Sequence, residues 1–147
     1  MKKGVTLIEL LISISIMVIL AAAAVPIYGN LQISSQMNEN SALITQTIRI
    51  ARQNSISRVN DSASGVKFFS DHLVLYQGSS YDIRSVAYDR VIPFDSALSL
   101  TTSLVSNEVN FSRESGLPDN IGEVVLTHTI GDVETITINK FGIVAGE

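Results

Sequence analysis

The chain has 147 residues, no cysteine, and a formal net charge of −4 from ten Lys and Arg against fourteen Asp and Glu. This length suits one domain preceded by an N-terminal helix. The acidic balance argues against a protein that tracks nucleic-acid phosphates, which needs clustered basic side chains. The lack of cysteine excludes disulfides, thiolate metal sites and cysteine nucleophiles.

The N-terminal segment is predominantly apolar. Residues 10–38 carry no charged side chain, and residues 10–28 are apolar apart from two serines and Pro26. Glu9 stands where this apolar run begins. A carboxylate is costly in lipid, so we expect Glu9 to be kept for a specific role.

Two general interpretations of this segment are a signal peptide and a plain membrane anchor. A secretory signal peptide would use residues 1–3 as its basic region and Ala21–Ala24 as its cleavage site. Glu9 and the continuation of the helical pattern beyond the alanines argue against it. A single-pass anchor needs about 20 apolar residues, which residues 5–26 just supply, and the basic start would place the N-terminus in the cytoplasm. In an anchor, Thr6 and Glu9 would form a capping box that satisfies free amides of the first turn.

A third interpretation rests on a family resemblance. The short basic leader ends in Gly4, and V-T-L-I-E at residues 5–9 and an apolar helix with Pro26 follow. This pattern resembles the class III signal of type IV prepilins and type II secretion pseudopilins. The resemblance implies that a prepilin peptidase cleaves after Gly4 and methylates the new amine of Val5. Val5 departs from the family pattern, in which phenylalanine is usual.

The resemblance also implies assembly roles for Thr6, Leu7, Glu9 and Pro26. Glu9 would be the fifth mature residue and would pair with the N-terminal amine of a neighbouring subunit. A buried unpaired charge is costly and an ion pair in low dielectric is strongly attractive, so this contact would set the axial register of the subunits. Pro26 would be the twenty-second mature residue, where the family helix commonly bends. Proline removes an amide donor, so we expect a kink or a loosened helix near residues 22–26.

Partners and location follow from the same resemblance. It implies contacts with other pilin or pseudopilin subunits, the prepilin peptidase, an inner-membrane assembly platform and the lipid bilayer. The chain would cross the bacterial inner membrane once, with its N-terminus cytoplasmic and its head periplasmic or extracellular, and would enter the filament after assembly. The expected divisions are a leader at residues 1–4, a transmembrane or filament-core helix at 5–28, its amphipathic continuation at 29–59 and a β-rich head at 60–147.

The continuation of the helix has one apolar face. Met37, Ile44, Ile48 and Ala51 recur at helical spacing, and Leu43 and Ile50 form an adjoining stripe. The polar side chains predicted to face water are Glu39, Gln46, Arg49, Arg52, Gln53 and Arg58. We therefore expect this part of the helix to lie across the sheet that follows.

Short strands are expected after a loop at residues 60–65. The runs that predict them lie at residues 66–69, 73–76, 83–88, 97–100, 108–111, 124–130, 133–139 and 141–144. Ser70-Asp71-His72 predicts a tight hairpin, and Gly131-Asp132 predicts a two-residue turn.

The later part of the chain resembles the H-type minor pseudopilins and the related minor pilins. Ala51-Arg52 matches a recurrent pair late in the family helix, and Phe111 and Gly116 match an F-x-x-x-x-G pattern before the final strands. The resemblance implies a pilin-like α+β fold. In this fold two small antiparallel sheets pack on the C-terminal half of a long N-terminal helix.

Little in the sequence indicates chemistry. His72 and His128 are 56 residues apart, outside any metal-spaced pair, and no hydrolase, zinc-protease, P-loop or dinucleotide motif is present. Two acidic pairs, Asp132 with Glu134 and Glu114 with Asp119, lack the spacing of a calcium loop. We expect no enzymatic activity, no cofactor and no metal.

DNA binding is not expected either. The basic side chains of the head are outnumbered by acids, and they are Lys67, Arg84, Arg90, Arg113 and Lys140. Two functions remain open. The first is a structural subunit of a type IV pilus or type II secretion pseudopilus, and the second is a membrane-anchored extracytoplasmic binding domain that does not polymerise.

Overall fold

The computed structural model describes residues 4–142 and 144–146, with the side chains of all of these except residues 23–27, 30, 145 and 146. The chain divides into two compact units, Met1–Gln36 and Met37–Glu147. Each unit is described by itself below. The second unit is called the head.

One helix, α1, spans Leu7–Ile56 and runs without interruption through Pro26. It ends three residues before the expected amphipathic continuation, residues 29–59, does. Arg58, Asn60 and Asp61 all have positive φ angles between 51° and 55°, which no helix continues through. A short 3₁₀ turn, η1 (Val59–Asp61), then leads the chain into the first strand.

Within the head, α1 buries one face. Ile44, Ile48 and Ala51 are fully buried and Met37 is nearly so, which confirms the predicted apolar face. Thr47 and Ser55 are also buried. The Thr47 hydroxyl donates to the Leu43 carbonyl, while the Ser55 hydroxyl donates to the Ser64 carbonyl and accepts from the Ser64 amide. These bonds satisfy polar groups that burial would otherwise leave unpaired.

The first sheet has the order β3-β2-β1-β5, with every pair antiparallel. Its strands are β1 (Ser64–Phe68), β2 (His72–Gln77), β3 (Arg90–Pro93) and β5 (Glu108–Phe111). Gly65 lies opposite Tyr76 on one side and Asn110 on the other. A Cβ on Gly65 would lie 2.5 Å from the Tyr76 Oη atom, so the strand needs glycine where it passes under this buried ring.

The second sheet has the order β4-β6-β7-β8 and is also antiparallel. Its strands are β4 (Leu98–Thr102), β6 (Gly122–His128), β7 (Val133–Ile138) and β8 (Val144–Gly146). The buried apolar side chains alternate along β6 and β7, as a sheet with one covered face requires. Part of the predicted last strand falls on residue 143, which lies outside the described residues.

Two local predictions are wrong. Residues 83–88 form no strand; Val86–Tyr88 is a 3₁₀ turn, η2, and the strand β3 begins only at Arg90. The turn between β6 and β7 is also longer than two residues, because the His128 amide donates to the Asp132 carbonyl across three intervening residues. Gly131, with a φ of +103°, completes this loop.

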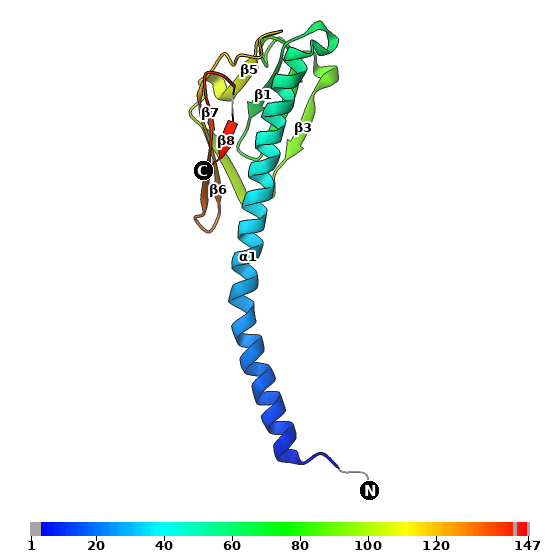
Figure 1. The fold of residues 1–147 in the computed structure, drawn as a ribbon, viewed down its shortest axis with the longest axis vertical. Helices are drawn as coiled ribbons and strands as arrows, with labels where there is room; N and C mark the ends of the chain where they lie inside the picture. Colours follow the sequence, from blue (N-terminus) through cyan, green and yellow to red (C-terminus); the bar gives the residue numbers. More distant parts are fainter. Residues whose placement is uncertain (1–3, 143, 147) are drawn as a thin grey trace. The chain divides into compact units, whose positions relative to one another are not determined.

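The head has the two antiparallel sheets that the resemblance implies, with the second half of α1 alongside them (Figure 1). Leu43 and Ile50 of α1 line a small hollow with Ile92 of β3, and Arg49 donates a 3.4 Å hydrogen bond to the Val144 carbonyl of β8. The helix therefore contacts both sheets. This arrangement confirms the predicted α+β class and is consistent with a pilin-like fold.

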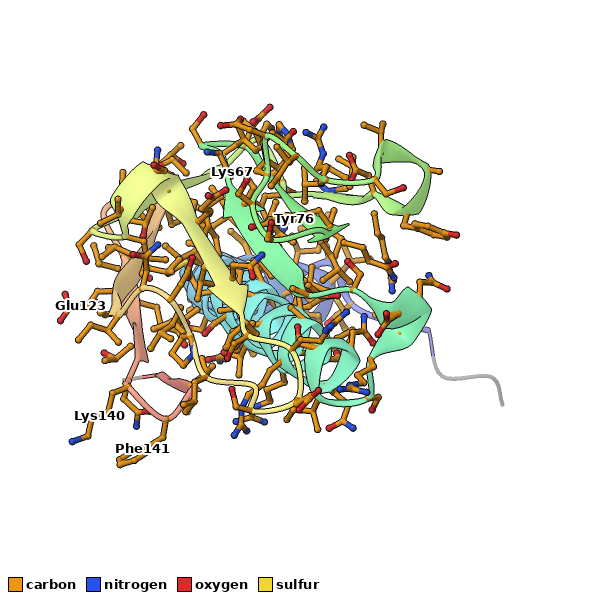
Figure 2. The ribbon with its side chains drawn as sticks, turned by 90° about the horizontal axis from the view of Figure 1, so that it is seen from above. Lys67, Tyr76, Glu123, Lys140 and Phe141 are labelled. Carbon is orange, nitrogen blue, oxygen red and sulfur yellow. The ribbon has the colours of Figure 1, made fainter. Side chains whose placement is uncertain are left out.

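Figure 2 shows the head with its side chains. Tyr76 lies within the head, whereas Lys140 and Phe141 project from its edge. The core of the first sheet consists mainly of Val66, Phe68, Leu73, Tyr76, Val109 and Phe111, and that of the second of Leu98, Leu100, Val124, Leu126, Ile136 and Ile138.

Candidate functional site

The expected cleavage site lies in an exposed segment before α1. Residues 4–6 are non-helical and exposed, and no other part of the described chain comes within 4 Å of a Cβ built on Gly4. A protease needs an accessible backbone around its target bond, and the Gly4–Val5 bond lies in an exposed, non-helical segment. The basic residues Lys2 and Lys3 of the expected leader lie outside the described residues.

Thr6 caps the first turn of α1. Its hydroxyl oxygen accepts a 3.3 Å hydrogen bond from the Glu9 amide, and its carbonyl accepts a 3.2 Å bond from the Leu10 amide. This satisfies one of the free amides that every helix N-terminus carries. This bond is the Thr6 half of the predicted capping box. Among the described residues the Glu9 carboxylate makes no return bond to the first turn, so the other half does not form.

The carboxylate of Glu9 is available for another partner. Glu9 is exposed, and among the residues that the structure describes none forms an ion pair or hydrogen bond with its side-chain oxygens. Its position in the first turn favours a negative charge, because the helix dipole is positive there. The first turn therefore presents an exposed acid beside the bond expected to be cleaved.

Between Glu9 and Leu20 the surface of α1 is apolar on all sides. Every large apolar side chain described between Val5 and Leu20 is exposed. The two serines in this run do not interrupt it, because the Ser13 and Ser15 hydroxyls donate 2.8 Å hydrogen bonds to the carbonyls of Glu9 and Leu11. A helix that is apolar all round requires an apolar environment, either lipid or other helices.

Within the part of the chain that the structure describes, no helix has both the length and the apolar character that a bilayer crossing requires. The side chain of Pro26, which the sequence places among the assembly residues, lies outside the described residues.

A second group of contacts, which we call the helix clamp, joins the end of α1 to two distant loops of the head. It consists of Arg52 and Ile56 of α1 with Gly116 and Gly142. Arg52 Nε donates to the Gly116 carbonyl at 3.1 Å, and both glycines have positive φ angles. A Cβ on Gly116 would lie 2.5 Å from Ile56 Cγ1, and one on Gly142 would lie 3.1 Å from Arg52 Cδ. Arg52 was predicted to face water, but it is half-buried and serves this contact.

Ion pairs reinforce the same end of the head. Arg58 pairs with Glu114, and Arg113 pairs with Asp61 at 3.1 Å and also donates to the Asp61 carbonyl at 2.7 Å. Glu114, which is not expected to bind calcium, is therefore engaged by an arginine. The Glu114 amide adds a hydrogen bond to the Ser55 carbonyl.

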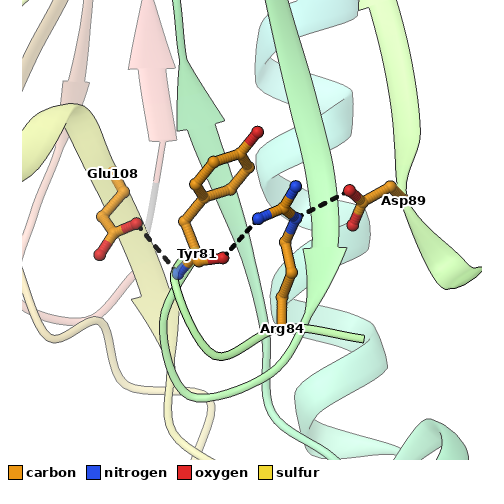
Figure 3. A network of polar contacts seen from close by, with 4 residues as sticks. All are labelled: Tyr81, Arg84, Asp89 and Glu108. Atoms are coloured by element: carbon orange, nitrogen blue, oxygen red, sulfur yellow. Dashed lines mark hydrogen bonds and ion pairs between the residues drawn. The ribbon is translucent and has the colours of Figure 1, made fainter. Parts of the chain in front are cut away.

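A polar network that no sequence pattern predicts lies in the loop between β2 and β3 (Figure 3). Arg84 Nε donates to Asp89 Oδ2 at 2.7 Å, and Arg84 Nη1 donates to the Tyr81 carbonyl at 2.7 Å. The Arg84 guanidinium also lies 3.6 Å from the centre of the Tyr81 ring, and the Tyr81 amide donates to Glu108 Oε2 at 3.2 Å. The hydrogen bond to Asp89 raises the pKa of Arg84. The spacing of Arg84 and Asp89 along the sequence does not show that they pair, because the pairing depends on how the loop folds back on itself.

The remaining candidates for chemistry do not converge. His72 is the first residue of β2, where its Nδ1 is 2.7 Å from Asp71 Oδ1 and its ring stacks on Phe69. The hydrogen bond from His72 lowers the pKa of Asp71. His128 is buried and its Nδ1 accepts from the Ile130 amide. No three His, Cys, Asp or Glu side chains gather into a possible metal site among the described residues.

A buried polar pair links the first sheet to the loop after β2. Asn110 Nδ2 donates to Tyr76 Oη at 3.2 Å and to the Gly78 carbonyl at 2.8 Å. Burial raises the pKa of Tyr76 far above its usual value. Asp119, which is likewise not expected to bind calcium, accepts a 2.8 Å hydrogen bond from the backbone amide of Asn110.

Comparison with known proteins gives one match. Residues 1–25 match the family model of the prokaryotic N-terminal methylation motif. No curated protein and no solved structure matches the chain. The match supports a type IV prepilin-like N-terminus and a processed, pilin-like or pseudopilin-like subunit, and it points to membrane anchoring through the N-terminal helix.

Proposed function

We propose that the chain is a structural subunit, a minor pilin or a pseudopilin, of a type IV pilus or a type II secretion pseudopilus. The subfamily that its later segments resemble most is the H-type minor pseudopilins. The observation that carries this proposal is the first turn of α1, where an exposed Glu9 follows an accessible Gly4–Val5 bond and precedes an apolar surface.

Cleavage would change the charge of this segment. A prepilin peptidase that cuts after Gly4 leaves a charged amine on Val5, four residues before Glu9. When subunits stack through their apolar helices, that amine is buried and requires a partner. The Glu9 carboxylate of a neighbouring subunit supplies it and fixes the axial register of the two helices.

The same surface serves the subunit before assembly. The apolar side chains between Val5 and Leu20 partition into the inner membrane, with the head on the periplasmic side. Ser13 and Ser15 cost little there because their hydroxyls are bonded within the helix. The role is assembly, without a catalytic step, and the partners are other subunits, the peptidase and the assembly platform.

Processing is tested by intact mass and N-terminal sequencing of the mature protein from cells that contain a prepilin peptidase. The proposal requires a start at a methylated Val5. A start near Val25 would instead indicate a signal peptide, and a retained Met1 would indicate a plain anchor.

Assembly is tested by Glu9→Val in the same cells. The variant should insert in the membrane but fail to enter filaments, whereas Glu39→Gln, at an exposed acid further along α1, should assemble normally. Normal incorporation of Glu9→Val subunits would show that the pairing role is wrong.

A further inference from the structure

The segment that follows β5 folds back along the outer edge of that strand. β5 is the last strand of the first sheet and has β1 on one side only (Figure 1). Residues 112–120, which we call the strap, lie on the other side, where Pro118 forms an antiparallel bridge with Phe111. An open sheet edge presents N–H and C=O groups that can pair with another extended chain. The strap therefore lies where such a chain would bind.

The backbone of Asn110 shows which groups of β5 face this edge. Its amide donates to Asp119 Oδ1 at 2.8 Å, and its carbonyl accepts from the Asp119 amide at 2.9 Å. Alternate residues of an antiparallel strand direct their N–H and C=O groups to opposite sides. Glu108 and Ser112 therefore face outward together with Asn110, and the residues between them face β1.

The backbone groups of Glu108 are occupied in the same way. Its carbonyl accepts a 3.2 Å hydrogen bond from Asn120 Nδ2, and its amide donates to the Val105 carbonyl. Asp119 and Asn120 thus use their side chains for bonds that a neighbouring strand would make with its backbone. Because a side chain has no second backbone edge, the sheet ends here.

The strap is held in place by other contacts. The Ser112 amide donates to the Leu117 carbonyl, and the Gly116 amide donates to the Ser112 carbonyl, both at 2.9 Å. Gly116 also belongs to the helix clamp, where its carbonyl accepts from Arg52. These bonds fix the strap without the two side chains that cover β5, so those side chains can be changed separately.

Edges of two other strands are protected as well. Beside β3, the Phe94 amide donates to the Asp71 carbonyl, so Pro93 faces outward by the same alternation, and proline has no N–H to offer. On β4, the Leu100 amide donates to the Ser70 carbonyl at 3.0 Å. Protection of β5 by the strap is therefore part of a wider pattern in the head.

We propose that the strap is a cover that prevents the β5 edge from pairing with another extended chain. The Asp119 carboxylate and the Asn120 amide occupy an outward N–H and an outward C=O of β5 in the folded head. Subunits that are concentrated in a membrane or a filament would otherwise be open to pairing through their strands. This device goes beyond the proposed function and does not depend on the Glu9 contact.

The first test compares Asp119→Ala with Asp119→Asn in the full chain, in enough detergent micelles that most contain one chain. Alanine removes the acceptor of the Asn110 amide, whereas asparagine retains an Oδ1 acceptor. Exchange of the Asn110 amide hydrogen should become roughly tenfold faster in Asp119→Ala and should stay near the natural rate in Asp119→Asn. Equal rates in Asp119→Ala and the natural chain would show that Asp119 does not cover the edge.

The second test measures pairing at the opened edge. Asp119→Ala, Asn120→Ala should form oligomers that bind thioflavin T, and their share should rise with protein concentration. Size-exclusion chromatography with light scattering measures this share. The natural chain and Asp119→Asn should stay as single chains. Association of Asp119→Asn to the same extent as Asp119→Ala would assign the effect to the lost charge and overturn the proposal.

Two control variants separate the cover from general effects. Asp132→Ala removes an exposed acid from the β6–β7 turn and should not associate. Ile136→Val lowers the stability of the second sheet by an amount similar to the loss of one hydrogen bond, and it leaves β5 untouched. The proposal is wrong if the double variant stays as single chains, or if Ile136→Val associates as strongly as the double variant does.

Discussion

Arg52, near the end of α1, donates a 3.1 Å hydrogen bond from Nε to the carbonyl oxygen of Gly116, 64 residues further along the chain. Gly116 lies so close to α1 that any side chain at this position would clash with Ile56. The positions of Phe111 and Gly116 in the structure explain the F-x-x-x-x-G pattern. Phe111 is buried in β5, and Gly116 lets the following loop approach the helix.

Gly116→Ala should destabilise the head. The new Cβ would lie 2.5 Å from Ile56 Cγ1, and alanine at a φ of +61° is strained. Overpacking and backbone strain together predict a loss of about 2–4 kcal/mol in the free energy of unfolding. Chemical denaturation of the full chain measures this loss.

Gly131→Ala is the matched control, because Gly131 also has a positive φ but nothing lies within 4 Å of its Cβ position. It should cost about 1 kcal/mol from strain alone. The double variant Ile56→Ala, Gly116→Ala should lose less than the sum of the single variants, since the smaller side chain makes room. Equal losses for the two glycines would contradict the close contact with the helix.

In Tyr76→Phe the free energy of unfolding should fall less steeply at alkaline pH than it does in the natural chain. Because burial raises the pKa of Tyr76, the folded protein holds the phenol proton more tightly than the unfolded chain does. The stabilisation from this proton is complete below about pH 10, the usual tyrosine value, and is lost as the pH rises above it.

The free energy of unfolding of the natural chain should therefore fall more steeply above about pH 10 than that of Tyr76→Phe. Tyr88→Phe, at an exposed position, should behave like the natural chain. Parallel curves for the natural chain and Tyr76→Phe would show that Tyr76 does not titrate with unfolding.

Arg84→Met should loosen the β2–β3 loop. The substitution removes both hydrogen bonds of the guanidinium and its contact with the Tyr81 ring, and it leaves the mostly buried carboxylate of Asp89 without its partner. Amide hydrogen exchange at Tyr81 and Ser85 should become faster. Arg90→Met, at an exposed arginine of β3, should leave these rates unchanged.

Removal of the unpaired charge of Asp89 should partly reverse the faster amide exchange predicted for Arg84→Met. Arg84→Met, Asp89→Asn should exchange more slowly at Tyr81 and Ser85 than Arg84→Met does, because an amide is cheaper to bury than an unpaired carboxylate. If the two variants exchange alike, the ion pair is not what orders the loop.

Thr6→Ala should weaken the first turn of α1. The substitution leaves the Glu9 amide without the Thr6 hydroxyl, and loss of such a cap costs about 1 kcal/mol. Faster exchange of the Glu9 amide in detergent micelles would report it. Thr6→Ser retains the hydroxyl and should keep the natural rate; a Thr6→Ala rate equal to that of Thr6→Ser would exclude the cap.

The long elements of the fold follow from sequence patterns. Ile44, Ile48 and Ala51 recur at helical spacing and are buried as predicted, because the helix and the sheets share one apolar interface. The strand predicted at residues 108–111 coincides with β5. The first predicted hairpin is correct apart from a shift of one residue, with β1 ending at Phe68 and β2 beginning at His72. The second is correct in position, but its turn is longer than predicted.

The errors have a common physical cause. Ile83, Val86 and Tyr88 form an apolar pattern typical of a strand, yet their side chains face outward and the loop is fixed by Arg84. β3 was missed because only Val91 and Ile92 of its residues have strand character, and its pairing with β2 decides its conformation. Contacts between distant residues, such as Arg52 with Gly116, leave no local pattern to read.

The helix clamp also determines when the head can complete its folding. The hydrogen bond from Arg52 to Gly116 joins residues 64 positions apart, and that from Arg49 to Val144 joins residues 95 positions apart. Contacts of such long range form only after the intervening chain has paid its loop-closure entropy, so they form late. A chain whose synthesis has not reached residue 144 therefore lacks the hydrogen bond that joins α1 to β8.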